Sequence, residues 1–205
     1  PMDAAKAIAL AVANKKHPSK LVGYFKGLRA PVPIYAVPTT AGTGSEVTVA
    51  AVVSDPETNR KLVIADTRLV PTMAALDPSL MTGLPRHVTA ATGMDALTHA
   101  IEAYTAIANR EFPLPVGEKS VYQGGNPLSE CFAEKAISLI GEHLVRAVEE
   151  PKNLASREGM ALAATLAGLA FANSGVALVH ALQAAVGGAT HSAHGAGNGL
   201  LLPHV

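Results

Sequence analysis

The first part of the chain is characterised by the stretch PIYAVPTTAGTGSE, residues 33–46 of 205. Its first six residues form a short apolar run with a proline at each end, which favours a buried strand in a parallel sheet. The hydroxyl- and glycine-rich residues 39–46 then lie at the carboxyl end of that strand, where parallel sheets bind ligands and where amides can hold phosphate or ribose oxygens. The alternative is an ordinary strand-to-helix turn in which Thr43 or Ser45 caps the following helix.

The residues on either side of this stretch favour a mixed α/β arrangement. Apolar residues recur at helical spacing from Met2 to about Lys16. Residues 47–53 fit either a strand or the start of a helix, whereas residues 61–65 and 73–77 fit two further short strands. We therefore expect an α/β region up to residue 83.

Beyond Pro85 the pattern changes to long Ala- and Leu-rich segments with a period of 3.6 residues. These segments predict a helical domain from residue 84 to 205, with helices over 87–105, 129–149, 156–171 and 177–186. Residues 109–127 form the one long stretch without periodicity, and a loop of that length is usually functional or mobile.

Composition excludes several classes of protein. Sixteen basic residues balance sixteen acidic ones, only 4% of residues are aromatic and none is Trp, so a nucleic-acid footprint is absent. No apolar run reaches the roughly 18 residues that a membrane span needs. The single cysteine, Cys131, allows no internal disulfide and reads as a packed small hydrophobe, which together with the lack of a leading signal segment predicts a cytoplasmic protein.

The residues best suited to bind a metal are an aspartate and several histidines in the second half. Asp95 and His99 are four apart on a predicted helix and therefore share one face. His180 lies in an apolar helix, and His191 and His194 follow among glycines expected to be flexible. An Asp/His₃ set suits Fe(II) or Zn(II) better than Ca²⁺ or Mg²⁺. The alternative is a solvated aspartate with histidines that are satisfied in the core.

Two other features bear on catalysis. Lys61 follows Arg60 at the start of a predicted strand, where it is either a solvated cation or a cation near the ribose or phosphate of a cofactor. The chain has no Gly-x-Ser-x-Gly motif, so a Ser/His/Asp triad is not favoured.

Three motifs together resemble the iron-containing (group III) alcohol dehydrogenases, and the resemblance runs in order through nearly the whole chain. Each motif is weak alone, but the set is specific. The resemblance implies a Rossmann-like domain joined to an all-helical domain, with a metal and a nicotinamide in the cleft between them. The motifs are PTTAGTGSE (38–46), GMDALTHAIE (93–102) and HGAGN (194–198).

This resemblance also implies site residues. Residues 1–83 become the carboxyl-terminal part of a dinucleotide-binding domain, and residues 84–205 a metal and substrate domain that is incomplete at its end. The cofactors implied are Fe(II) or Zn(II) and NAD or NADP, the substrates a primary alcohol and its aldehyde, and the assembly a homo-oligomer. The implied metal ligands are Asp95, His99, His180 and His194, and the implied cofactor contacts are Thr39, Thr40, Lys61, Met81, Leu84 and Pro85.

The chain departs from the family pattern in three places. Many members carry a proton-relay histidine where this chain has Ala184, so His191 becomes the candidate catalytic residue. The loop 109–127 is longer than usual. The glycine-rich pyrophosphate loop of the family would precede Pro1, so we expect an internal fragment that binds metal but binds NAD(P) poorly.

Other functions stay open from the sequence. One is a polyol dehydrogenase of the glycerol type or a dehydroquinate-synthase-like enzyme, which shares the architecture. Another is a truncated helical scaffold without catalytic activity.

Overall fold

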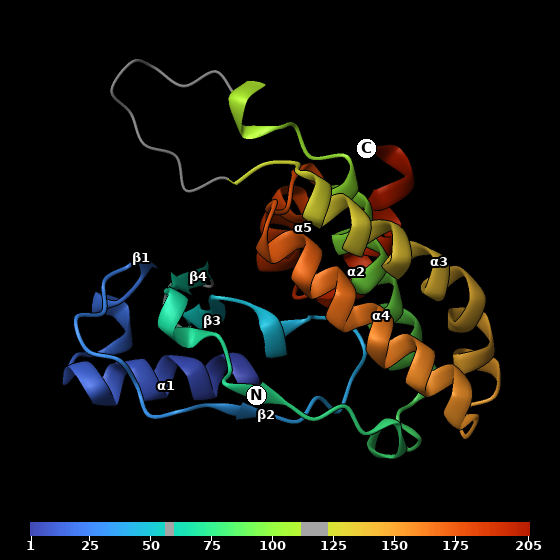
Figure 1. Cartoon of the computed structure of the whole chain (residues 1–205), viewed down its shortest axis with the longest axis horizontal. Coiled ribbons are helices and arrows are strands. Elements are labelled where there is room, and N and C mark those ends of the chain that lie inside the picture. Colours follow the sequence, from blue (N-terminus) through green and yellow to red (C-terminus); the bar gives the residue numbers. More distant parts are fainter. Residues whose placement is uncertain (56–59, 112–122) are drawn as a thin grey trace.

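A computed structural model describes residues 1–55, 60–111 and 123–205. The strands and α1 lie on one side of the molecule, and the longer helices lie on the other (Figure 1). The strands are β1 (Gly23–Tyr24), β2 (Tyr35–Ala36), β3 (Ala50–Asp55), β4 (Arg60–Ala65) and β5 (Met73–Ala74). The helices are α1 (Met2–Asn14), α2 (Arg86–Tyr104), α3 (Pro127–Glu149), α4 (Leu154–Ala172), α5 (Leu178–Thr190) and α6 (His194–Leu201).

The strands form two small sheets. One has the order β1-β4-β3, in which β1 pairs with β4 in parallel and β3 pairs with β4 in antiparallel fashion. The other consists of β2 and β5 in parallel. A partial α/β region followed by helices is therefore confirmed, and residues 47–53 contain both a 3₁₀ turn (Ser45–Val47) and the start of β3.

The strand expected over residues 33–38 is much shorter and more exposed than predicted. Only Tyr35 and Ala36 are in β2, and the Tyr35 side chain is 67% exposed. Pro33 and Pro38 have no N–H to donate, so the ladder cannot extend to either end of the run. Within the described residues β2 has a partner strand on one side only, which leaves the other edge open.

Helix α1 is fastened to the α/β region by its polar residues. The Lys6 side chain is buried and donates hydrogen bonds to the carbonyls of Ser45, Thr48 and Ala50 at 2.5, 2.8 and 3.2 Å. Asp3 accepts hydrogen bonds from the Ser45 hydroxyl and the Val52 amide. The helix ends at Asn14 rather than Lys16 because Lys15 adopts a left-handed conformation.

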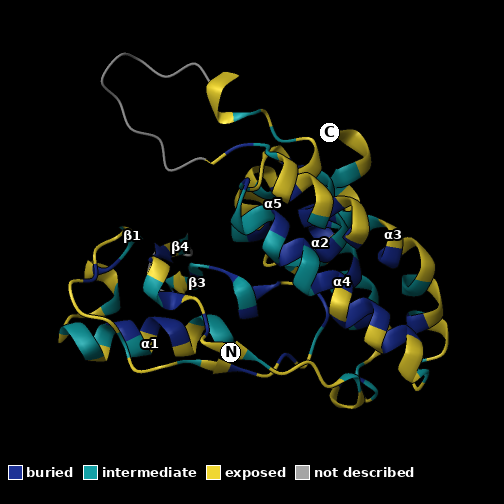
Figure 2. Ribbon diagram, viewed as in Figure 1, coloured by how far each residue is buried: buried dark blue, intermediate teal, exposed yellow. Residues whose placement is uncertain are grey.

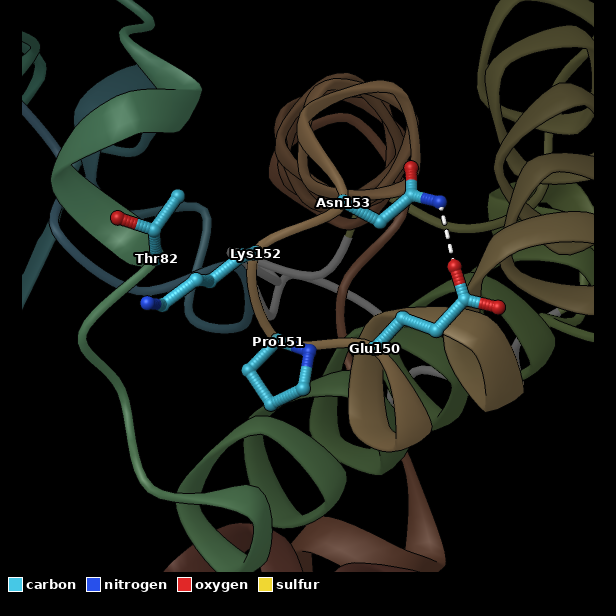
Figure 3. Close-up of a pocket in the computed structure, with 5 residues that line it drawn as sticks. All are labelled: Thr82, Glu150, Pro151, Lys152 and Asn153. Atoms are coloured by element: carbon cyan, nitrogen blue, oxygen red, sulfur yellow. Dashed lines mark hydrogen bonds between the residues drawn. The ribbon is translucent and has the colours of Figure 1, made fainter.

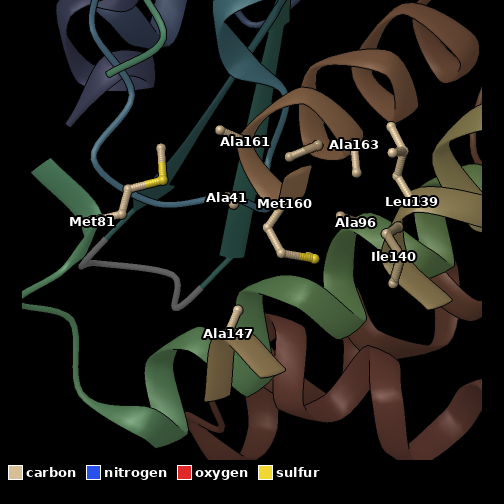
Figure 4. Close-up of a cluster of buried hydrophobic side chains, with 10 residues drawn as sticks. Ala41, Met81, Ala96, Leu139, Ile140, Ala147, Met160, Ala161 and Ala163 are labelled. Carbon is tan, nitrogen blue, oxygen red and sulfur yellow. The ribbon is translucent and has the colours of Figure 1, made fainter. Parts of the chain in front are cut away.

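The helical half packs through alanines. The faces of α2, α3 and α4 that meet are buried (Figure 2), and small side chains there allow the helices to approach closely. Larger side chains, such as Met160 and Ile140, fill the space at one end of this core (Figure 4). The four predicted helices are confirmed to within a few residues at each end. The buried alanines of these helices are Ala96, Ala100, Ala103, Ala133, Ala136, Ala147, Ala161, Ala163, Ala164, Ala167 and Ala170.

Two glycines allow the loop after β2 to dock on the helical half. Gly44 has a φ of 60° and lies so close to α4 that a Cβ on it would be 2.6 Å from the Cα of Gly168. Beside this contact the Thr165 hydroxyl donates a hydrogen bond to Glu46 at 2.7 Å. The hydroxyl- and glycine-rich motif is therefore a structural joint between the two halves of the chain.

The glycines after His191 are not flexible as expected, because residues 194–201 form α6. A Cβ on Gly195 would meet the Ala91 carbonyl of α2, and one on Gly197 would meet the Gln183 side chain of α5. Glycine thus lets a short helix pack against two others. None of the described helices is long and apolar enough to cross a membrane.

The loop 109–127 is described only at its ends, by a 3₁₀ turn (Asn109–Glu111) and by residues 123–126, where Ala108 pairs with Gly124. The prediction for this loop otherwise concerns residues 112–122, which lie outside the described residues.

Candidate metal centre

Three of the four predicted ligands form a compact buried cluster. Asp95 and His99 lie one turn apart on α2, and His180 projects from the first turn of α5. One potential ligand atom from each of these side chains lies within 4.8 Å of the others. The rings of His99 and His180 are stacked with their centroids 4.5 Å apart. The helical spacing of residues 95 and 99 thus places both side chains on the face of α2 that meets His180.

His194 joins this cluster from the first turn of α6. Its Nε2 is 3.5 Å from Oδ1 of Asp95, and Nε2 of His180 is 3.8 Å from the same oxygen. Donors that surround one tetrahedral metal at 2.0–2.3 Å are separated by about 3.3–3.8 Å. The separations of the two nitrogen atoms from Oδ1 of Asp95 therefore agree with a shared divalent cation.

The environment of His99 and His194 favours the neutral form that a metal requires. Burial is the main reason that the pKa of His99 is lowered to about 4; Asp95 opposes this shift, and the neighbouring His180 and His194 add to it. Burial likewise lowers the pKa of His194. The Nδ1 atom of His99 is buried and has no hydrogen-bond partner among the described residues. A neutral imidazole with an unpartnered nitrogen in a carboxylate-lined cluster fits a metal ligand better than a satisfied core residue.

Phe171 of α4 covers the other face of His99. The two rings are stacked with their centroids 4.3 Å apart. This contact leaves the His99 ring between Phe171 and His180, and so restricts its rotation. Residues outside the ligand set therefore contribute to the orientation of a ligand.

Glu102 is a site residue that sequence reasoning missed. Its buried carboxylate accepts a hydrogen bond from Nδ1 of His180 at 2.6 Å and others from the Ala177 and Val179 amides. Burial acts to raise the pKa of Glu102, but these hydrogen bonds hold it below its usual value. Its place three residues after His99, on the same helix face, was the available signal.

Asn198 is the second site residue that was missed. It is fully buried, and its Nδ2 lies 2.7 Å from Oδ1 of Asp95, 3.2 Å from Nε2 of His180 and 3.3 Å from Nε2 of His194. The signal in the sequence was an asparagine four residues after His194, which α6 places on one side of the helix.

The predicted cofactor residues lie in three separate places. Thr39 and Thr40 line a cavity of about 620 Å³ beside the first turn of α1, together with Asp3 and Ser45. Lys61 lies elsewhere, because its ammonium nitrogen is 3.3 Å from Nδ1 of His194. The structure thus places one cofactor candidate beside the metal cluster and two at the helix terminus.

The remaining cofactor candidates lie at the entrance to the helical half. Met81 is buried in the core (Figure 4), Leu84 packs against the same core, and Pro85 precedes α2. Next to this segment is an open hollow of about 490 Å³, lined by Thr82 and residues 150–153, in which Asn153 donates a hydrogen bond to Glu150 (Figure 3). Contact of residues 81, 84 and 85 with a cofactor stays a prediction.

His191 is exposed at the carboxyl end of α5. It has a φ of 54°, and its amide hydrogen-bonds to the Gly187 carbonyl. Among the described contacts, none joins the His191 ring to Asp95, His99, His180 or His194. Its catalytic role therefore also stays a prediction. Ala184, at the position of the missing relay histidine, is exposed on the same helix.

Comparison with known proteins agrees with this fold and site. Residues 1–78 match the family model for iron-containing alcohol dehydrogenase, and residues 116–205 match that for the C-terminal part of the Fe-containing alcohol dehydrogenase family. Together the two matches cover more than half of the chain. The chain belongs to the iron-containing alcohol dehydrogenase family.

Individual relatives are similar over the whole chain. It is 43% identical over 204 residues to the probable alcohol dehydrogenase EutG of Salmonella typhimurium, covering 100% of this chain and 48% of that protein. It is 41% identical to the NAD-dependent methanol dehydrogenase of Bacillus methanolicus, covering 99% and 49%. The crystal structure of a 1,3-propanediol oxidoreductase superposes with a TM-score of 0.89 at 41% identity, covering 100% and 49%. The chain therefore spans about half the length of the curated relatives it matches.

Proposed function

We propose that this chain contributes the metal centre and part of the nucleotide-binding region of an NAD(P)-dependent alcohol dehydrogenase. The observation that carries the proposal is the cluster of Asp95, His99 and His180, whose potential ligand atoms lie within 4.8 Å of one another, with Nε2 of His194 3.5 Å from Oδ1 of Asp95. We assign Asp95, His99, His180 and His194 as the ligands. Residues 1–83 then belong to the nucleotide-binding domain and residues 84–205 to the metal domain.

The donor set supports Fe(II), with Zn(II) as the alternative. Three nitrogen donors and one carboxylate suit either ion, and the family description names iron. When bound, such an ion supplies Lewis acidity, which favours loss of the hydroxyl proton of an alcohol and transfer of its hydride to a nicotinamide. The chain's own contribution is to keep His99 and His194 neutral and to fix the rings by stacking and hydrogen bonds.

We assign the cavity beside α1 to the NAD(P) cofactor. Thr39 and Thr40 offer hydroxyl groups there, and the first turn of α1 offers backbone N–H groups that favour anions. The relative from Bacillus methanolicus is described as NAD-dependent, which supports NAD as the first cofactor to test. Lys61 is placed between the strands and the metal cluster, where its charge can contact the ribose or phosphate of a bound nucleotide.

The proton released from the alcohol needs an acceptor, and we assign this role to His191. It is exposed, and it lies three residues before the ligand His194. His191→Ala is expected to lower turnover and to shift its pH dependence, while leaving metal affinity unchanged. An unaltered pH profile would remove His191 from the mechanism.

The substrate class that the relatives support is a small primary alcohol and its aldehyde. A short diol is the second candidate, because the 1,3-propanediol oxidoreductase structure is similar over the whole chain. Parallel assays with ethanol and 1,3-propanediol distinguish these two classes.

The proposal is tested first through the metal. Isothermal titration with Fe(II) under anaerobic conditions, and with Zn(II), should give one site per chain. Asp95→Ala should abolish binding, whereas Asp77→Ala, an exposed carboxylate that caps a 3₁₀ turn, should not. A second titration with NAD and NADP, followed by alcohol-dependent cofactor reduction, tests the activity. A native chain that binds no divalent ion would refute the proposed function.

A further inference from the structure

Each nitrogen of the His180 ring faces a polar group from another helix. Nδ1 lies 2.6 Å from Oε2 of Glu102, and Nε2 lies 3.2 Å from Nδ2 of Asn198. A neutral imidazole carries one N–H, and its hydrogen-bond partners determine which nitrogen holds the proton. The tautomer of His180 can therefore be deduced from these two neighbours.

In its contact with Nδ1 of His180, Glu102 can only accept a hydrogen bond. Its Oε1 accepts the amide hydrogens of Val179 and His180 at 2.7 and 3.3 Å, and its Oε2 accepts that of Ala177 at 2.9 Å. A carboxylate that accepts backbone hydrogens at both oxygens is held in its ionised form and has no hydrogen to donate. Nδ1 of His180 must then carry the proton.

Asn198 leads to the same tautomer from the other side of the ring. Its amide nitrogen points to Oδ1 of Asp95 at 2.7 Å, and a carboxylate oxygen requires a donor there. This fixes the orientation of the amide, so the group that faces Nε2 of His180 is also a donor. Nε2 must then present its lone pair, in agreement with a proton on Nδ1.

We propose that Glu102 and Asn198 are positioning residues that hold His180 as the Nδ1–H tautomer, so that the lone pair lies on Nε2 before a metal arrives and displaces the hydrogen bond from Asn198. The role of this tautomer in metal binding rests on the metal site proposed above. The tautomer itself is a property of the metal-free chain. Glu102 also holds the first turn of α5 through the three backbone amides. One carboxylate on α2 thus fixes both the start of α5 and the ring that α5 carries.

The direct test is nitrogen NMR of the metal-free chain with ¹⁵N-labelled histidine at mildly alkaline pH. His180→Gln identifies the His180 signals. We expect the proton on Nδ1 and an unprotonated Nε2. A proton on Nε2 of the native chain would overturn the inference without the need for any variant of Glu102.

The variant Glu102→Gln tests whether Glu102 determines the tautomer of His180. Its amide replaces one of the two acceptor oxygens by a donor, so the proton of His180 should move to Nε2 in the molecules whose amide nitrogen faces Nδ1. Asn153→Ala is the matched control, because Asn153 caps α4 with hydrogen bonds to Ser156 and Glu150. It should lower stability and leave the His180 tautomer unchanged. Glu102→Leu offers Nδ1 no acceptor in any orientation, so a Glu102→Leu chain that folds and keeps its proton entirely on Nδ1 would refute the role of Glu102.

Metal affinity supplies the second measurement. Competition for Co(II) against a chromogenic chelator should show a loss on the order of 10- to 100-fold in Glu102→Gln, as for other groups that orient a histidine ligand. In a His180→Ala background the same change should cause no further loss, whereas an equal loss in both backgrounds would contradict the inference. A native chain with Nδ1–H that binds no Co(II) would refute the proposed function and leave the tautomer assignment standing.

Discussion

The ammonium nitrogen of Lys61 lies 3.3 Å from Nδ1 of His194, so a side chain of β4 reaches the first turn of α6. An ammonium group only donates hydrogen bonds, so this contact requires a lone pair on Nδ1. Coordination of a metal through Nε2 instead places the proton of the neutral ring on Nδ1. The contact between Lys61 and His194 therefore competes with metal binding.

Replacement of Lys61 by Met should raise both the pKa of His194 and the affinity for a divalent cation. Burial is the main reason that this pKa is low, and the charge of Lys61 lowers it further, so the pKa should rise but stay below its ordinary value. The rise is measured by NMR titration of the metal-free chain, and the affinity should increase several-fold in a chelator competition. Lys16→Met, which removes an exposed charge from the region after α1, is the control. A fall in affinity would show that Lys61 supports the metal site instead.

The stability of the metal-free chain should depend on pH through His99. Its pKa is about 4 in the folded state and 6.5 at its ordinary value, so the unfolded state binds more protons between these limits. The free energy of unfolding should therefore rise with pH from about 4 to 6.5, by roughly 3 kcal/mol at most from this residue. Urea unfolding at a series of pH values measures the slope. His99→Gln should remove this part of the slope, and an unchanged slope would contradict the assignment.

Lys6→Met should destabilise the chain by roughly 2–4 kcal/mol. The change leaves three buried carbonyls without their donor, and this cost exceeds the gain from removing a desolvated charge. Burial lowers the pKa of Lys6 to about 8 from an ordinary 10.5. The unfolded state thus binds more protons between pH 8 and 10.5, and the native chain should gain stability as pH rises through this window. The variant should lack that gain, as measured by urea unfolding.

Gly168→Ala tests the joint between the two halves. A Cβ at this position would lie 2.7 Å from Cγ2 of Val47 and 2.9 Å from the Cα of Gly44, so a loss of roughly 1–3 kcal/mol is expected. Gly141→Ala on α3 is a matched control, because a Cβ there meets nothing within 4 Å. It should instead stabilise the chain by up to about 1 kcal/mol, since alanine is the better helix former. Equal effects of the two changes in thermal unfolding would argue against a tight joint.

The parts of the fold that follow from local pattern were predictable from the sequence. The four long helical segments showed the 3.6-residue period, and Asp95 and His99 could be placed on one helix face. Helix α6 could not be predicted, because glycines disfavour a helix in the absence of other information. Only the structure reveals that these glycines allow α6 to pack closely against α2 and α5. The division of the chain at residues 83 and 84 stays a prediction.

The roles of Glu102 and Asn198 depend on contacts that the sequence does not reveal. Glu102 acts on residues 177–180, more than 70 positions away along the chain, and Asn198 lies against Asp95 only because α6 folds onto α2. Contact of Lys61 with the ribose or phosphate of a cofactor stays a prediction, and nothing in the sequence indicated the contact of Lys61 with His194. Its neighbour His194 comes from a helix that the sequence did not predict.

The origin of the four ligand side chains on α2, α5 and α6 makes a metal ion a cross-link between distant parts of the chain. Helices α5 and α6 contain no Lys, Arg, Asp or Glu of their own, and their polar contacts with α2 include those of His180 and His194 with Asp95 and of His180 with Glu102. A cation that binds only the folded chain adds RT ln(1 + [metal]/Kd) to its stability. The last quarter of the chain should consequently become more resistant to proteolysis as the metal concentration rises. The rate at which a protease cleaves within these two helices then depends on the metal concentration.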